Sequence, residues 1–101
     1  MKIVCLCGST KFKQEFLDVM DKEERKGNIV LSIGSFTHAD NIDISDKVKE
    51  ELDILHLMKI DIADEILVID KDGYKGESTT REILYALKLD KDIRYYSIEY
   101  K

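Results

Sequence analysis

Apolar residues in this chain gather in short runs, and stretches with helical spacing separate them. Runs of about five residues without Gly or Pro predict buried strands, of the kind that a parallel sheet covers on both faces. The predicted strands are residues 3–7, 29–33, 65–69 and 93–98. The last of these alternates between apolar and polar residues, which is typical of a strand at the edge of a sheet.

Three of the stretches between strands place apolar residues on one helical face. The stripes are Phe12, Phe16, Val19 and Met20; Val48, Leu52, Leu55, Ile60 and Ile62; and Ile83, Leu84, Ala86 and Leu87. We expect Ser9 or Thr10 to cap the first helix and Gly27 to end it. Ser45 or Asp46 is expected to cap the second helix.

The order of these elements is β-α-β-α-β-α-β, which predicts a parallel sheet with right-handed crossovers. We expect a three-layer α/β/α fold with a four-stranded parallel sheet in the strand order 2-1-3-4. A chain of 101 residues without an internal repeat or a linker is expected to form a single domain, residues 1–101. The first and third strands are then neighbours, so the loops that follow them face each other at the carboxyl edge of the sheet, where ligands bind.

Two segments at this edge form the candidate ligand site. They are Gly8-Ser9-Thr10, after the first strand, and Gly76-Glu77-Ser78-Thr79, at the start of the third helix. Glycines, hydroxyl groups and the free amides of a helix N-terminus can together hold a phosphate. The alternative is an ordinary strand-to-helix turn with a Ser or Thr cap. Neither segment contains the G-x-G-x-x-G or the Walker A pattern.

Glu82 is the candidate catalytic residue, because it follows the start of a helix at the carboxyl edge of the sheet. A carboxylate that points into the crevice there can attack an anomeric carbon or activate water. The spacing Thr79-x-x-Glu82 also fits a capping box, in which the glutamate bonds back to the N–H of the cap residue. Both interpretations stay open at the level of sequence.

Three further positions have both a functional and an ordinary interpretation. Asp61 or Asp64 can supply the second carboxyl group for glycosidic-bond cleavage, or can be a cap or a solvated side chain. His38, two residues before Asp40 in the loop 34–44, can act as an acid or base or bind a ligand, or can be a solvated loop histidine. Tyr74 can stack on a base or lie exposed in its loop.

The net charge and the two cysteines indicate which partners and which compartment to expect. A net charge of −5 provides no basic surface for nucleic-acid polymers or anionic membranes. Cys5 and Cys7 point the same way on the first strand, where we expect two thiols in the core and a reducing, cytoplasmic compartment. His56 is interpreted as structural, and we expect no metal-ligand cluster and no cofactor.

Three short motifs resemble the nucleoside 2-deoxyribosyltransferase-like superfamily, which includes small phage and bacterial proteins of unassigned function. They are Cys7-Gly8-Ser9-Thr10, Asp61-x-x-Asp64, and Gly76-x-Ser78-x-x-x-Glu82-Ile83-x-Tyr85-Ala86, and together they span nearly the whole chain. The resemblance implies a flavodoxin-like or Rossmann-like fold with a nucleoside or nucleotide in the crevice. It also implies that Glu82 attacks C1′ of the sugar, that Asp61 assists the departing base, and that Ser78 and Thr79 hold a 5′-phosphate with the first loop.

The resemblance leads to three functional hypotheses. The first is an enzyme, a transferase or hydrolase that acts on the N-glycosidic bond of a (deoxy)nucleoside or its 5′-monophosphate. The second is a non-catalytic module that senses or sequesters a nucleotide-derived ligand, and Gly76 favours it because the transferases carry an aspartate there. The third is a structural protein without nucleotide affinity. By analogy with the family, we also expect a homo-oligomer.

Overall fold

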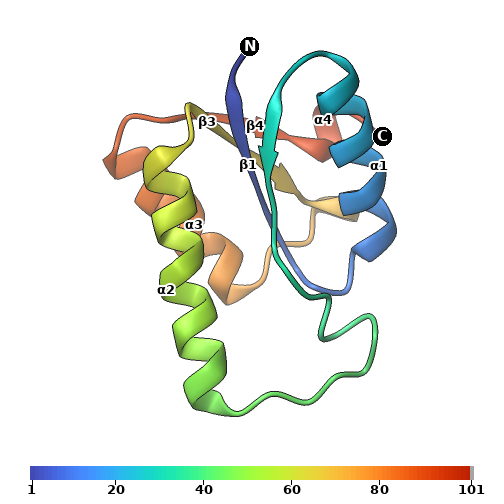
Figure 1. The fold of residues 1–101 in the computed structure, drawn as a ribbon, viewed down its shortest axis with the longest axis vertical. Coiled ribbons are helices and arrows are strands. Elements are labelled where there is room, and N and C mark those ends of the chain that lie inside the picture. The colour runs from blue at the N-terminus through green and yellow to red at the C-terminus, as the bar shows by residue number, and fades with distance from the viewer. Residues whose placement is uncertain (101) are drawn as a thin grey trace.

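The computed structural model describes residues 1–100, and its centre is a four-stranded parallel sheet (Figure 1). The strands are β1 (Ile3–Gly8), β2 (Ile29–Leu31), β3 (Glu65–Ile69) and β4 (Asp92–Tyr95), in the order β2-β1-β3-β4. The predicted three-layer fold and the predicted strand order 2-1-3-4 are confirmed. β1 and β3 are the central pair, and they are paired from Val4 with Glu65 to Gly8 with Ile69.

Helices cover both faces of the sheet (Figure 1). α1 (Lys13–Arg25) and the short α4 (Tyr96–Glu99) cover one face, and α2 (Asp46–Ile62) and α3 (Glu77–Lys88) cover the other. Alternate residues of β1 contribute to the two cores: Val4 and Leu6 pack with α1, whereas Cys5 and Cys7 pack toward α2 and α3. The two cysteines therefore share one face of the strand, as the period-two pattern predicts.

Several element boundaries differ from the prediction. The last strand ends at Tyr95 rather than at residue 98, because the chain turns there into α4. The second strand ends at Leu31 rather than at residue 33. Neither Ser9 nor Thr10 caps the first helix, since α1 begins after Phe12 and no side chain caps it. A short 3₁₀ turn, η1 (Lys71–Gly73), follows β3.

Two predicted helix-end signals are confirmed. The side chain of Ser45 accepts a hydrogen bond from the amide of Val48 at 3.2 Å and so caps α2. Gly27 follows α1 with a φ of 90°, a conformation that glycine adopts without the steric cost of a Cβ. Its amide donates to the carbonyl of Glu24 at 2.9 Å, which satisfies one of the free carbonyls at the helix end.

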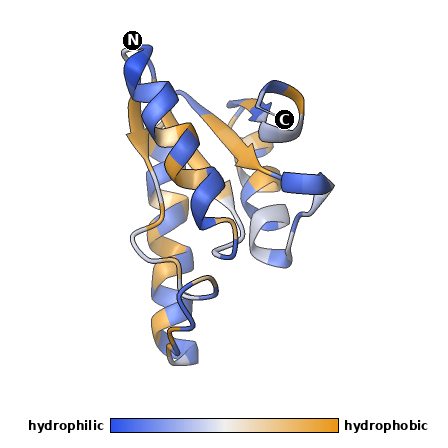
Figure 2. Cartoon of the chain, turned by 90° about the vertical axis from the view of Figure 1, so that its right-hand side faces the viewer, coloured by the Kyte–Doolittle hydropathy of each residue, from blue (hydrophilic) through white to orange (hydrophobic). Residues whose placement is uncertain are grey.

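The apolar residues of α2 lie mostly at the surface, which corrects their predicted packing. His56 and Ile60 are its buried residues. The exposed ones are Val48, Leu52, Ile54, Leu55, Met58 and Ile62. The N-terminal half of α2 extends past the end of the sheet (Figure 1), and the ribbon of this protruding part carries both hydrophobic and hydrophilic residues (Figure 2). None of the helices in residues 1–100 has the length and apolar character required to cross a membrane.

Candidate functional site

Three loops meet at the carboxyl edge of the sheet. The loop after β2 contacts the loop after β1, because the amide of His38 donates to Oγ1 of Thr10 at 3.2 Å. The loop after β3 contacts the same segment, since the rings of Phe12 and Tyr74 pack edge to face at 5.9 Å. Nζ of Lys11 lies 3.4 Å from the centroid of the Tyr74 ring. The loops after β1 and β3 are therefore in contact, through Lys11, Phe12 and Tyr74 rather than through the two predicted segments.

Gly8 ends β1 at a point where the backbone passes very close to β3. A Cβ at this position would lie 2.9 Å from both Cβ and the carbonyl oxygen of Ile69, and 3.2 Å from the ring of Phe16. Only a residue without a side chain fits there without a shift of the neighbours. The requirement for glycine at this position thus comes from packing, whatever ligand the loop binds.

The hydroxyl groups of Ser9 and Thr10 accept hydrogen bonds from backbone amides of the loops. Oγ of Ser9 accepts from the amide of Lys11 at 3.3 Å, and Oγ1 of Thr10 accepts from the amide of His38. Thr10 and His38, both predicted ligand residues, line a hollow of about 390 Å³. The other residues that line this hollow are Thr37, Asn41, Ile42 and Asp43.

The start of α3 differs from the predicted arrangement. Gly76 is the N-cap and provides no side chain, so α3 begins at Glu77. Ser78 faces α2, where its Oγ accepts from Nζ of Lys49 at 3.3 Å. Thr79 is buried within the first turn. Ser78 is thus positioned toward α2, whereas Tyr74 makes the contact with the first loop.

Glu82 is a buried residue inside α3, and its side chain is 8% exposed. The capping-box interpretation is wrong, because the helix begins at Glu77 and Thr79 therefore lies inside it rather than at the cap. Burial raises the pKa of the Glu82 carboxyl to about 7, while the charge of His56 acts in the opposite direction. Negative charge on Cys5 and Asp53 also contributes to the increase.

Asp61 lies in the last turn of α2 and is exposed. The hydroxyl of Tyr85 donates to its carboxylate at 2.6 Å, and this hydrogen bond raises the pKa of Tyr85. Asp64 accepts from the amide of Ile3 at 2.7 Å, so it anchors the start of β1. The aspartate whose charge acts on Glu82 is Asp53, one of the residues that sequence reasoning did not select.

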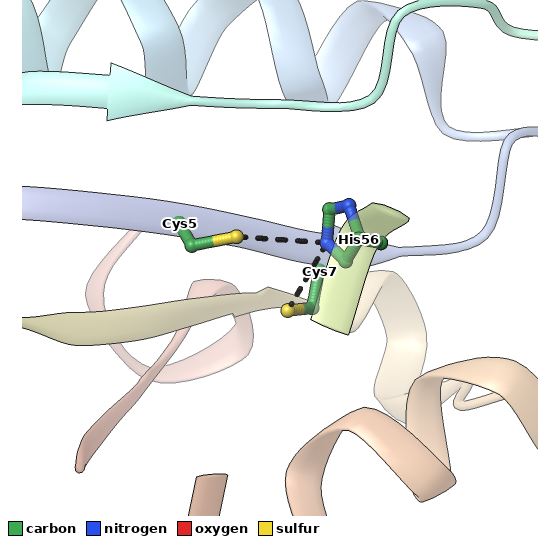
Figure 3. Close-up of side chains that lie close together, drawn as sticks. All are labelled: Cys5, Cys7 and His56. Atoms are coloured by element: carbon green, nitrogen blue, oxygen red, sulfur yellow. Dashed lines mark hydrogen bonds between the residues drawn. The ribbon is translucent and has the colours of Figure 1, made fainter. Parts of the chain in front are cut away.

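A second feature that sequence reasoning missed lies between β1 and α2 (Figure 3). Sγ of Cys5 and Sγ of Cys7 each lie 3.6 Å from Nε2 of His56. Both cysteines are fully buried free thiols, and His56 is 5% exposed. The expectation that no metal-ligating set surrounds the cysteines needs correction, since these three side chains have ligand atoms within 4.8 Å of one another.

The three groups of this cluster shift one another's ionisation. The hydrogen bond with Cys7 lowers the pKa of Cys5 to about 6, and His56 contributes in the same direction. The same hydrogen bond, together with burial, raises the pKa of Cys7 well above its usual range. Burial lowers the pKa of His56, but the interactions with Cys5 outweigh it, so the pKa is raised.

These features define a class of protein by fold alone, a parallel three-layer α/β protein with loops gathered at the carboxyl edge of its sheet. A search of family models, curated proteins and solved structures finds no match to the chain. The resemblance to the nucleoside 2-deoxyribosyltransferase-like superfamily consequently stays a hypothesis.

Proposed function

We propose that this protein binds a nucleoside or nucleoside 5′-monophosphate at the carboxyl edge of its sheet and cleaves or transfers at the N-glycosidic bond. The observation that carries the proposal is Glu82, a buried carboxyl group that is not used as a helix cap. Buried carboxyl groups near the ligand-binding edge of a parallel sheet are suited to chemistry at an anomeric carbon.

In the proposed reaction, a carboxylate oxygen of Glu82 forms a bond to C1′ while the bond from C1′ to the base nitrogen breaks. The departing base takes up a proton from an acid of the site, and water or a second base then releases the sugar from Glu82. The family pattern assigns the acid to Asp61, but this side chain accepts a hydrogen bond from Tyr85. Asp53, whose charge acts on Glu82, is paired with Lys49 at 3.0 Å, so Asp61 stays the proposed acid.

The proposed phosphate site combines the first loop with the start of α3. Gly76 leaves the first amides of α3 without a side-chain cap, and such amides bind anions. Lys11 adds a positive charge next to them, through its contact with Tyr74. Gly8 and Ser9 complete this site from the first loop, whereas Ser78 faces α2 and Thr79 is buried, so the side chains that the family pattern assigns to the phosphate do not reach it in this arrangement. Thr10, His38 and Tyr74 surround the base and the sugar.

The second candidate function is a binding module without catalysis, and one observation favours it. The hollow that Thr10 and His38 line does not include Glu82 among its lining residues. A ligand seated in this hollow contacts the loops and leaves the carboxyl group unused. Gly76 supports the same candidate, because the transferases of the proposed family carry an aspartate there.

We further propose that the protein forms a homo-oligomer through α2 and functions in the cytoplasm. Ile54, Met58 and Ile62 are each more than half exposed on this helix. Exposed apolar residues gathered on one element are typical of an interaction surface. The two reduced cysteines fit a reducing compartment.

The test is incubation of the purified protein with a panel of (deoxy)nucleosides and their 5′-monophosphates, followed by chromatography for released base. A thermal-shift scan of the same panel runs in parallel, because a ligand that binds only the folded state raises Tm. Released base that disappears in Glu82→Gln, but persists in Glu77→Gln, supports the enzyme. Glu77 is the matched control, an exposed carboxylate in the first turn of the same helix.

Other outcomes of this test separate the hypotheses. A thermal shift without released base supports the binding module. Full activity in Glu82→Gln contradicts the assignment of the nucleophile. If no member of the panel gives a shift or released base, both candidate functions are wrong, and the structural hypothesis is favoured.

A further inference from the structure

The cluster of Cys5, Cys7 and His56 has the donor atoms and the spacing of a metal site (Figure 3). β1 presents the two thiols on one face because they are two residues apart on a strand. α2 crosses that face and brings Nε2 of His56 to 3.6 Å from each sulfur. Two adjacent elements of the fold, β1 and α2, therefore direct three ligand-type atoms toward one point.

Hydrogen bonding explains only part of this arrangement. Nε2 of an imidazole carries either one lone pair or one proton, so it makes one well-directed hydrogen bond. Here two sulfur atoms lie at the same distance from this nitrogen. A cation between the three atoms would be coordinated by both sulfurs and by the nitrogen.

The two sulfur-to-nitrogen distances fit tetrahedral zinc. With Zn–S of about 2.3 Å and Zn–N of about 2.0–2.1 Å, tetrahedral angles place sulfur and nitrogen about 3.5–3.6 Å apart. The observed separations are 3.6 Å for both sulfurs. In the same geometry the two sulfur atoms lie about 3.8 Å apart, whereas all three donor atoms here lie within 4.8 Å of one another, so bound zinc would draw the sulfurs together by up to about 1 Å.

We propose that Cys5, Cys7 and His56 form a binding site for a thiophilic divalent cation, Zn²⁺. Thiolate and imidazole are the ligands that zinc prefers, and two Cys with one His leave a fourth position open. A water molecule completes the set as an oxygen ligand. The inference does not use Glu82 and therefore does not depend on the proposed nucleoside chemistry.

Charge balance also supports zinc in this interior. Two thiolates neutralise the charge of Zn²⁺, so the bound set carries no net charge into the core. The bound ion links β1 to α2 and thereby stabilises the folded chain.

The test uses the full chain without a histidine tag, reduced and freed of metal with a chelator. Co²⁺ replaces zinc in such sites and gives a sulfur-to-cobalt charge-transfer band in the near ultraviolet. We expect one equivalent of Co²⁺ to produce this band, one equivalent of Zn²⁺ to abolish it, and Zn²⁺ to raise Tm. Zinc binding is also expected to release protons from the thiols.

Three variants and one control identify the ligands. Cys5→Ser, Cys7→Ser and His56→Gln should each weaken zinc binding by more than about 100-fold, since loss of even an outer-shell partner costs about 10–100-fold. His38→Gln is the control, because His38 is exposed and lies outside the cluster. It should bind Zn²⁺ like the wild type.

Circular dichroism of the metal-free variants separates loss of a ligand from loss of the fold. If a variant does not fold, X-ray absorption at the zinc edge of the zinc-bound wild type identifies the ligands instead. We expect two sulfur ligands and one imidazole nitrogen. The proposal is overturned if the folded wild type gives no sulfur-to-cobalt band. It is equally overturned if Cys5→Ser and Cys7→Ser bind Zn²⁺ as tightly as the wild type, or if the absorption edge shows only nitrogen and oxygen ligands.

Discussion

Arg94 donates two parallel hydrogen bonds to the carboxylate of Glu23, from Nη1 to Oε1 at 2.8 Å and from Nη2 to Oε2 at 2.9 Å. Glu23 is fully buried on α1, and Arg94 lies on β4, so this pair joins two elements far apart in the chain. Lys26, Asn28 and the hydroxyl of Tyr100 also donate to Glu23. The hydrogen bonds from Arg94 hold the pKa of the Glu23 carboxyl well below its usual range.

Glu23→Gln should strongly destabilise the protein. The change removes the buried charge that Arg94 pairs with, and breaking a buried pair on one side typically costs about 3–5 kcal/mol. Arg94 keeps its bonds to Glu65 and Glu99, so we expect a loss near the lower end of that range. The measurement is the free energy of unfolding in urea.

Glu24→Gln is the control for this variant, since Glu24 is the exposed neighbour on the same helix. We expect it to change the free energy of unfolding by no more than about 0.5 kcal/mol. Equal stabilities of the two variants would contradict the structural importance of the pair.

The same pair predicts a loss of stability in acid. The pKa of Glu23 is lower in the folded state than its ordinary value of about 4.3, so the folded state favours the ionised form. This contribution is fully present above about pH 5 and decreases as the pH falls toward the depressed folded-state pKa. Tm measured from pH 7 to pH 3 should therefore fall less steeply in Glu23→Gln than in the wild type. Parallel curves would show that Glu23 does not titrate differently on folding.

Gly8→Ala should destabilise the protein, whereas Gly34→Ala should not. A Cβ at Gly8 would lie 2.9 Å from the backbone and side chain of Ile69, and overpacking of this kind costs about 1–3 kcal/mol. No atom lies within 4 Å of a Cβ built at Gly34. Equilibrium unfolding of both variants gives the comparison. A wild-type stability for Gly8→Ala would mean that β1 and β3 separate more easily than their packing indicates.

Ile54→Lys should weaken self-association through α2 without loss of the fold. Ile54 is 58% exposed, so a lysine there meets solvent in the monomer but places a charge in a contact between two copies. Light scattering after gel filtration should give a smaller particle than the wild type at the same concentration. Glu51→Lys is the control, because Glu51 is an exposed polar residue of the same helix. A monomeric wild type would contradict the proposed homo-oligomer.

Sequence reasoning located the strands well because burial on both faces leaves a short, uninterrupted apolar run. β3 illustrates this, since all five of its residues are buried and its bounds match the prediction. The end of β4 was wrong because residues 93–98 have the composition of a strand. Ser97 instead donates to Asp70 through its amide at 2.9 Å and its hydroxyl at 2.7 Å, contacts that pair α4 with the end of β3.

The candidate site was harder to predict, because it depends on which residues face each other across elements. The spacing from Thr79 to Glu82 suits a capping box, but the helix begins earlier, at Glu77, and the glutamate turns into the core. Asp61 fits the family motif by position, yet it lies at the end of α2 with Tyr85. The available signal for His56 was a histidine between Leu55 and Leu57 in a predicted helix, which was interpreted as structural.

The sequence by itself determined the order of strands and helices, the parallel sheet and the alternation that places both cysteines on one face. These follow from local periodicity and from the handedness of the crossovers, which act on every α/β chain. Only the tertiary structure decided that α2 brings His56 to Cys5 and Cys7, and that Arg94 lies against Glu23. Such contacts depend on how helices pack across a sheet, and no local pattern specifies the distance between side chains from different elements.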